Sequence, residues 1–547
     1  MRCSRARAGL LVSLALAISL LSACGATPTP QPTPAQTPAA VAGPAAGGRL
    51  VYGLTLAPSG IDPHADASSE LGIPLTSVYD TLVYQDLDGS FVPGLAERWE
   101  ISDDGLVYTF YLRQGVRFHD GTPFDARAVQ FNLDRIRGLG AQSRKAGEML
   151  GPYESSEVVD EHTVRLHFAR PFAPLLDSAS QVYLGMASPT AVERWGAEYQ
   201  LHQVGTGPFM MREYVPNDHL TLVRNPDYAW APEVYGHDGP AYLDEIEFRF
   251  YVDPAVRALA LESGEVHVMG EVPPQDALRL EGDDRFALYR VPVPGHPLQF
   301  LLNSARPPTD DLRVRQALLY ATDRQAIVGT VFVNYSPVAW GPLGAATMGF
   351  EPSLEGTYAF DPARAAALLE EAGWLDADGD GIRERDGQPL VLQAYLMGWG
   401  YLPEVGQMLQ SQLRAVGIDL QTQTVAFPAA VEAASQGLHH LAPMTLSSSD
   451  PSVLNPTFLS SNVGGFNWSH VQDPELDRLL EQAVQELDVN SRAALYSQAQ
   501  VRIMDQALTL PIRDYVNLNA ASSAVRGLQF DRRGWFPWLY DVSLERE

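Results

Sequence analysis

The chain has 547 residues, which suffices for three or four domains of about 150 residues each. With 38 Lys and Arg against 66 Asp and Glu, its formal net charge is −28 at pH 7. That balance excludes a nucleic-acid-binding protein, because such proteins need a basic face. A hydrophobic fraction of 46% indicates that most of the chain is globular.

Two scarce residue types exclude further classes of site. Lys145 is the only lysine and does not lie in a P-loop motif. The sequence therefore has no P-loop, a motif in which a lysine binds the phosphates. The two cysteines, Cys3 and Cys24, both lie near the N-terminus. This excludes a disulfide framework and a cysteine-ligated zinc site in the rest of the chain.

The N-terminus predicts export from the cell. A basic start is followed by an uncharged apolar segment at residues 8–23, which is the pattern of a signal peptide. The sequence LSACG at residues 21–25 resembles the lipobox of bacterial lipoproteins, in which the cysteine is acylated and becomes the mature N-terminus. We therefore expect residues 1–23 to be removed and Cys24 to carry the lipid. A plain signal peptide cut after Ala23 is the alternative.

A Pro- and Ala-rich segment follows at residues 24–48 and carries no charge. Such a composition cannot bury a core and predicts an extended tether, with a reach of roughly 75 Å at ~3.1 Å per residue. The tether and the acylated cysteine together predict a domain held at the outer face of the cytoplasmic membrane, on the periplasmic or extracellular side. Contact with the membrane is expected through the lipid anchor only.

Beyond the tether, short strands alternate with capped helices, the pattern of an α/β fold. The strands are expected at residues 50–54, 106–112, 163–168 and 246–251, with a further strand beginning at 418–420. The helices are expected at residues 124–136, 361–373, 403–416 and 473–483, and two of them open with Asp-Pro, an N-cap followed by proline at the first helical position.

Ordered blocks of sequence resemble one known family. They lie at residues 79–83, 91–99, 104–110, 112–124, 205–209, 225–228, 260–266, 311–318 and 321–324. Together they resemble the family 5 extracellular solute-binding proteins of ABC importers, the peptide/nickel-binding type. The resemblance covers about residues 49–540 of the chain.

The resemblance implies a two-lobed periplasmic-binding-protein fold of the α/β class, with a hinge and an extra domain inserted in the first lobe. The expected division is residues 49–79, 200–290 and 505–547 for the first lobe, 80–199 for the extra domain and 291–504 for the second lobe. A monomer of this kind captures a peptide or similar polar solute between closing lobes. It delivers the solute to the membrane subunits of an ABC permease and their ATPase. The resemblance implies that it is not an enzyme. The rival class is a secreted hydrolase, but the sequence contains no HExxH, GxSxG or cysteine nucleophile.

The expected ligand is set by a run at residues 443–451. In peptide-binding relatives an aspartate in this run holds the ligand's α-amine, whereas here the matching position is Ser447, followed by a retained Asp450. A buried ammonium without a counter-charge is costly, while a hydroxyl suits a neutral ligand. A peptide remains the first expectation, with an oligosaccharide or another neutral solute as the alternative.

Other candidate ligand contacts are side chains in loops, and two of them, Trp399 and Tyr401, follow a strand expected at residues 390–396. The candidates are Ser59, Trp399, Tyr401, Asn467 and Trp468. The aromatic rings are suited to stacking on a sugar or a side chain. For the aromatic residues the alternative is a place in the core or at the rim of a lobe.

No cofactor is expected, apart from a structural calcium ion at one acidic loop. Asp376, Asp378 and Asp380 are spaced like the start of a calcium loop, but the twelfth position, where a bidentate Glu belongs, is Gly387. A solvated acidic turn is the alternative.

Overall fold

The computed structural model describes residues 46–57, 60–65 and 69–545. The signal peptide, Cys24, nearly all of the tether and Ser59 lie outside these residues.

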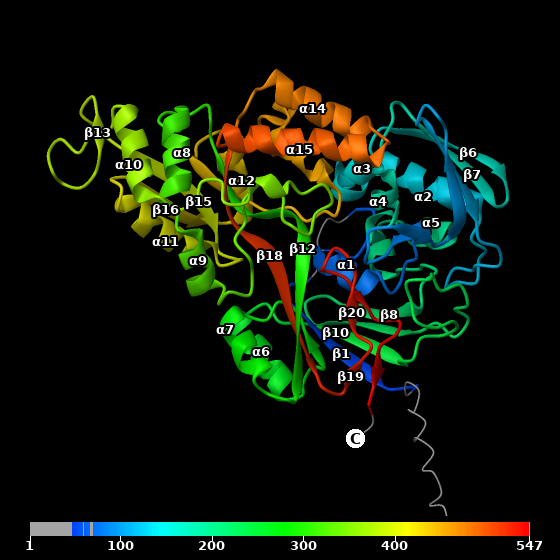
Figure 1. Cartoon of the computed structure of the whole chain (residues 1–547). Helices are drawn as coiled ribbons and strands as arrows, with labels where there is room; N and C mark the ends of the chain where they lie inside the picture. The colour runs from blue at the N-terminus through cyan, green and yellow to red at the C-terminus, as the bar shows by residue number, and fades with distance from the viewer. Residues whose placement is uncertain (1–45, 58–59, 66–68, 546–547) are drawn as a thin grey trace, which may run out of the picture. The chain divides into compact units, whose positions relative to one another are not determined.

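A ten-stranded mixed sheet is the backbone of the described part (Figure 1). Its central strands, β12 and β18, are long and antiparallel and join two halves of the sheet. The strand order is β16 (Asp419–Val425), β15 (Val391–Met397), β17 (Leu441–Met444), β12 (Phe286–Leu302), β18 (Thr509–Ser522), β11 (Val268–Met269), β1 (Arg49–Leu54), β10 (Glu245–Phe250), β9 (His219–Arg224) and β8 (Phe209–Val215).

In the half that begins with β11, strand β1 runs parallel to both β10 and β11. Two helices belong to this half, α6 (Pro254–Glu262) and α7 (Pro274–Glu281). Asp253 caps α6 by accepting a hydrogen bond from the N–H of Ala255 at 2.9 Å, and Pro254 occupies the first helical position. The side chains between these helices and the sheet form a core of their own.

In the other half, β15 is parallel to β16 and to β17, and α11 makes the crossover between β15 and β16, as the sequence predicts. Asp361 and Asp473 cap their helices as expected. The helices of this half are α8 (Leu312–Ala321), α9 (Arg324–Val331), α10 (Pro362–Glu371), α11 (Leu402–Arg414), α12 (Phe427–Ser435), α13 (Leu454–Phe458), α14 (Pro474–Gln485) and α15 (Val489–Asp505).

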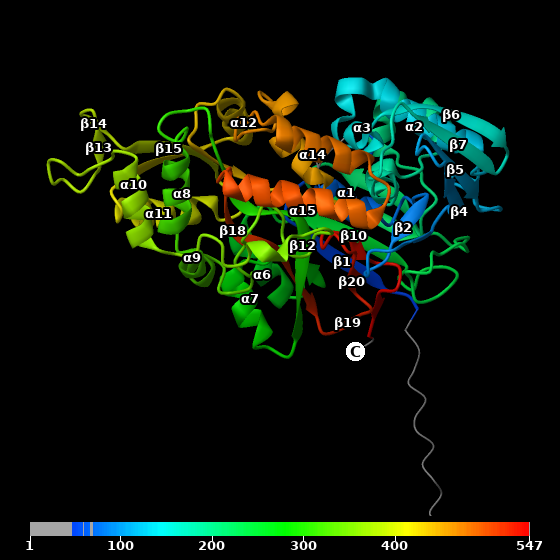
Figure 2. The same ribbon diagram turned by 45° about the horizontal axis from the view of Figure 1, so that its top comes forward.

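A separate four-stranded sheet, β4-β5-β7-β6, lies with α2 at one side of the large sheet (Figures 1 and 2). Its elements are β4 (Ala96–Ile101), β5 (Val107–Leu112), α2 (Ala126–Leu139), β6 (Tyr153–Asp160) and β7 (Thr163–Phe168). The remaining elements are α1 (Ser69–Leu75), β2 (Val83–Gln85), β3 (Phe91–Pro93), α3 (Arg144–Leu150), α4 (Leu175–Ala179), α5 (Pro189–Trp195), β13 (Glu384–Arg385), β14 (Gln388–Pro389), β19 (Val525–Arg526), β20 (Gln529–Phe530), β21 (Pro537–Trp538) and β22 (Ser543–Leu544).

Candidate functional site

The candidate site lies where the carboxyl ends of parallel strands from both halves of the sheet meet β18. In open α/β sheets this edge is where ligands bind. Glu271 follows β11 on one side and Tyr401 follows β15 on the other, and Arg513 and Tyr515 lie on β18 between them. The charge of Glu271 acts on both tyrosine hydroxyls, so the two halves of the sheet contribute to one polar cluster.

Glu271 and Arg257 form the part of the cluster that comes from the first half. Glu271 is half-buried and has a left-handed backbone, with φ of 43°. Its carbonyl oxygen accepts a hydrogen bond from Nη1 of Arg257 at 3.2 Å, which holds this strained residue in place. Burial raises the pKa of the Glu271 carboxyl, and the nearby guanidinium and a hydrogen bond with Thr55 only partly offset that effect.

Arg513 is the cation that β18 contributes to the cluster. Its guanidinium carbon lies 3.9 Å from the ring centroid of Phe332 and 4.5 Å from that of Tyr515, and Nη1 donates to Oγ of Ser336 at 2.7 Å. Burial lowers the pKa of Arg513, while Tyr515 and Tyr401 favour its charged form. Together with Arg257, the cluster therefore contains one carboxyl and two guanidinium groups among aromatic rings, an arrangement suited to a small polar or zwitterionic molecule.

Trp399 and Tyr401 take different positions beside this cluster. Trp399 is exposed over 49% of its surface. The aliphatic Leu56 (52%) and Val252 (59%), which follow the parallel strands β1 and β10, are exposed as well. Tyr401 is half-buried, and its ring centroid lies 5.8 Å from that of Phe332. Burial raises the pKa of Tyr401 to about 12, so the hydroxyl stays protonated and able to donate. The exposed indole of Trp399 is free of such core packing.

Ser447 and Asp450, although close in sequence, have different environments. Ser447 is exposed and forms an isolated β-bridge with Gly295. The Asp450 carboxylate is buried and accepts two hydrogen bonds from Arg492, each at 2.7 Å. Burial alone would raise the pKa of Asp450, but the guanidinium of Arg492 lowers it. The carboxylate is therefore engaged within the protein.

Asn467 and Trp468 are also engaged within the protein. Asn467 is fully buried, and its Nδ2 donates to the carbonyl oxygens of Leu459 and Val471, each at 3.0 Å. Trp468 is 3% exposed and its Nε1 donates to the carbonyl oxygen of Gly465 at 2.9 Å. The structure therefore places Asn467 and Trp468 in the core. For Trp468 this is the alternative that the sequence left open. Trp399, by contrast, is exposed.

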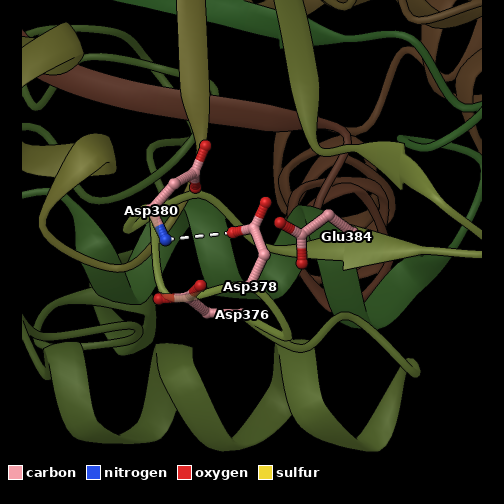
Figure 3. A group of neighbouring side chains, drawn as sticks. All are labelled: Asp376, Asp378, Asp380 and Glu384. Atoms are coloured by element: carbon pink, nitrogen blue, oxygen red, sulfur yellow. Dashed lines mark hydrogen bonds between the residues drawn. The ribbon is translucent and has the colours of Figure 1, made fainter.

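The acidic loop brings four carboxylates together (Figure 3). One oxygen each from Asp376, Asp378, Asp380 and Glu384 lies within 4.8 Å of the others. The sequence analysis missed Glu384, although it stands at the ninth position of a calcium loop, which supplies a ligand in such loops. The N–H of Asp380 donates to Oδ1 of Asp378 at 3.0 Å, and the N–H of Ala377 donates to Glu384 at 2.9 Å. Oxygen ligands of this kind suit a hard cation.

Sequence reasoning also missed Glu271, Arg513 and Asp514. The sequence RDYVNLN at residues 513–519 could have revealed Arg513 and Asp514. There, charged and amide side chains interrupt a long strand whose other side chains are mostly buried in the core. Polar residues in such a strand need partners or a ligand.

Residues 90–468 match the model of bacterial extracellular solute-binding proteins, family 5. The chain belongs to this family. Family 5 proteins are non-enzymatic substrate-binding components of ABC importers that work outside the cytoplasm. Within the residues that the structure describes, no helix is long and apolar enough to cross a membrane.

Relatives and solved structures agree with the family assignment. The glutathione-binding protein GsiB of Pectobacterium atrosepticum is 29% identical over 82% of this chain and 85% of its own length. The structure of NikA from Brucella suis in complex with Fe(III)-EDTA matches with a TM-score of 0.81 at 25% identity, covering 91% of this chain and 100% of that one. A dipeptide binding protein from Pseudoalteromonas sp. SM9913 in complex with Met-Leu matches with a TM-score of 0.77 at 23% identity, covering 91% and 100%. The fold is the mixed α/β periplasmic-binding-protein fold of this family.

Proposed function

We propose that this protein captures a peptide or a similar small zwitterionic solute, glutathione included, between two closing lobes and delivers it to a membrane permease. The observation that carries the proposal is the cluster of Glu271, Tyr401, Arg513 and Tyr515, which draws on both halves of the sheet. A solute that touches all of them stabilises the closed arrangement, because only there do both halves contribute contacts.

We propose the lobe division at residues 49–79, 200–290 and 505–547 against 291–504, with 80–199 as the extra domain. Contacts between these parts support a closed form. Oγ of Ser449 donates to Asp177, which also accepts from Nη2 of Arg533 at 3.0 Å. In addition, the N–H of Ala173 donates to the carbonyl oxygen of Val484 at 3.0 Å. Opening of the lobes would break the bonds that involve residues 449 and 484.

The ligand class rests on the site and on the relatives together. One relative is named for glutathione and one similar structure is in complex with Met-Leu, and each molecule combines an ammonium with carboxylate and amide groups. The guanidinium groups and the exposed Trp399 of this site match the carboxylates and the side chains of such solutes. The exposed Ser447 favours the alternative, a neutral solute such as an oligosaccharide, since a hydroxyl has no charge to offer.

The lipid anchor is part of the proposal. The lipobox at residues 21–25 and the tether at 24–48 support attachment to the outer face of the cytoplasmic membrane through Cys24. In cells that make the wild-type protein it is expected in the membrane fraction, and Cys24→Ser is expected to release it. Equal fractionation of the two forms would contradict the anchor.

A thermal-shift screen of the purified protein tests the ligand class. The probes are glutathione, Met-Leu, maltotriose and Ni²⁺ with L-histidine. A ligand at 100 times its Kd stabilises the folded state by about 2.7 kcal/mol. For a chain of about 500 residues, the entropy of unfolding is about 1 kcal/mol/K, so the expected rise in Tm is about 2–3 °C. A shift with maltotriose alone, or with none of the four, would overturn the zwitterionic ligand.

A further inference from the structure

The hinge strands are interrupted at one place. Pairing of β12 with β18 stops at Val293, opposite Tyr515, and resumes at Leu298. The intervening residues 294–297 form a bulge that lies opposite Asp514. Bulges of this kind are frequent next to active sites, where they redirect a side chain. The bulge therefore leaves Asp514 with no paired residue on β12.

The bulge is held by two other segments of the chain. The N–H of Gly344 donates to the carbonyl oxygen of Gly295 at 2.8 Å, and the N–H of Gly295 donates to Oγ1 of Thr347 at 2.8 Å. On its other side, Gly295 forms the β-bridge with Ser447. A Cβ at Gly295 would lie 2.2 Å from the carbonyl oxygen of Leu446, and φ there is +112°, so only glycine fits. The three segments thus form one fixed frame around the hinge.

The carboxylate of Asp514 lies beside the turn at residues 344–347 and has few hydrogen-bond partners. Oδ2 accepts one hydrogen bond from the N–H of Ala345 at 3.1 Å, and Oδ1 has no hydrogen-bond partner among the described residues. The turn at residues 344–347 carries no ionisable side chain. A desolvated carboxylate that uses one of its four acceptor sites is costly to keep ionised. Burial accordingly raises the pKa of Asp514 to about 6.

The other charged and titratable groups around Asp514 compensate its charge only in part. Arg513 precedes it on β18 and partly offsets the effect of burial on the pKa of Asp514, but its guanidinium is held between aromatic rings. The Tyr515 hydroxyl is neutral, because burial raises its pKa. From the bulge, His296 is also neutral, because burial lowers its pKa to about 3. Asp450, from the loop after β17, is paired with Arg492.

We propose that Asp514 receives a cationic group of the bound solute, a primary ammonium, at the hinge bulge. This inference rests on the proposed function, and it assigns the ligand's ammonium to Asp514, on the face of β18 opposite to Arg513 and Tyr515, and not to Glu271. An ammonium has three donors and satisfies the free oxygen of the carboxylate while it neutralises the charge. A metal ion fits less well, since it needs several oxygen ligands and Asp514 offers one carboxylate.

Calorimetric titration with matched ligands tests this assignment. Met-Leu and N-acetyl-Met-Leu differ in the charge of the amine, and Asp514→Asn removes the carboxylate charge with little change of shape. Wild type is expected to bind Met-Leu at least tenfold more tightly than the acetylated form. Asp514→Asn is expected to lose that preference without weaker binding of N-acetyl-Met-Leu. Asp419→Asn, at the amino end of β16 and away from the candidate site, makes the same change of net charge and is expected to behave as wild type.

The pH dependence of wild type is a second readout that needs no variant. With a pKa of about 6, the carboxylate is ionised to about nine-tenths at pH 7 and one-tenth at pH 5. From pH 7 to pH 5, affinity for Met-Leu is therefore expected to fall about tenfold more than affinity for the acetylated form, whose own pH dependence reports other groups of the site such as Glu271. Binding of Met-Leu that is unchanged by Asp514→Asn and by pH would overturn the role of Asp514 and leave the proposed function intact. Failure of wild type to bind any of the zwitterionic probes would overturn both.

Discussion

Removing the charge of Asp450 is expected to destabilise the protein without a selective loss of ligand binding. The side chains of Asp450 and Arg492 are 4% and 8% exposed, and two hydrogen bonds of 2.7 Å join them. Breaking a buried pair by removing one partner costs about 3–5 kcal/mol, because the other charge is left without compensation. At about 1 kcal/mol/K for a chain of this size, Asp450→Asn should lower Tm by about 3–5 °C.

Calorimetry and titration together test this reasoning. The double variant Asp450→Asn/Arg492→Met removes both charges and should recover part of the lost Tm. The pKa of Asp450 is lowered in the folded state, so the pair stabilises the protein above the unfolded pKa, about 3.9, and this stability is lost as pH falls through the folded value. The deficit of the single variant should thus shrink below about pH 4. An unchanged Tm at pH 7 combined with weaker binding of Met-Leu would refute the structural role and assign Asp450 to the ligand.

Three further predictions concern the loop, the closed form and the aromatic edge. Calcium at 1 mM should raise Tm relative to EDTA, and Asp378→Asn should abolish that rise; the same Tm in both conditions would indicate a solvated turn. Ser449→Ala should weaken Met-Leu binding about fivefold in calorimetry, since the lost hydrogen bond to Asp177 stabilises the closed form by about 1 kcal/mol; unchanged affinity would contradict a bond specific to closure. Trp399→Ala should weaken binding about tenfold through lost stacking, with Tm of the free protein changed by less than 1 °C; equal affinity would place the indole outside the site.

The sequence predicts the parallel parts of the fold well. The strand at 246–251, the helix at 403–416 and the return to a strand near residue 418 all follow from local periodicity and caps, and the structure confirms them within a few residues. The hinge is different. β12 contains three prolines, at positions 292, 294 and 297, which argue against a central strand, and its partner β18 lies some two hundred residues away.

The site was harder to predict than the fold. Trp399 and Tyr401 follow a strand that the sequence reveals, so their position at the edge of the sheet could be anticipated. Asp450, Asn467 and Trp468 could not be told from ligand contacts, because their partners, such as Arg492, are distant in sequence. Asp514 escaped notice for the same reason: its free oxygen depends on a bulge formed by another strand.

Capture of the solute by closure is tested most directly by the distance between the two proposed lobes, measured with and without solute. The only cysteines lie at positions 3 and 24, so a Cys3→Ser/Cys24→Ser background can carry spin labels at the exposed positions Leu278→Cys and Phe360→Cys, one in each proposed lobe. Pulsed dipolar spectroscopy is expected to show a broad distribution that includes longer, open distances in the free protein. Saturating Met-Leu or glutathione should collapse it to one short distance. A distribution that stays the same at saturation would contradict capture by closure between two lobes.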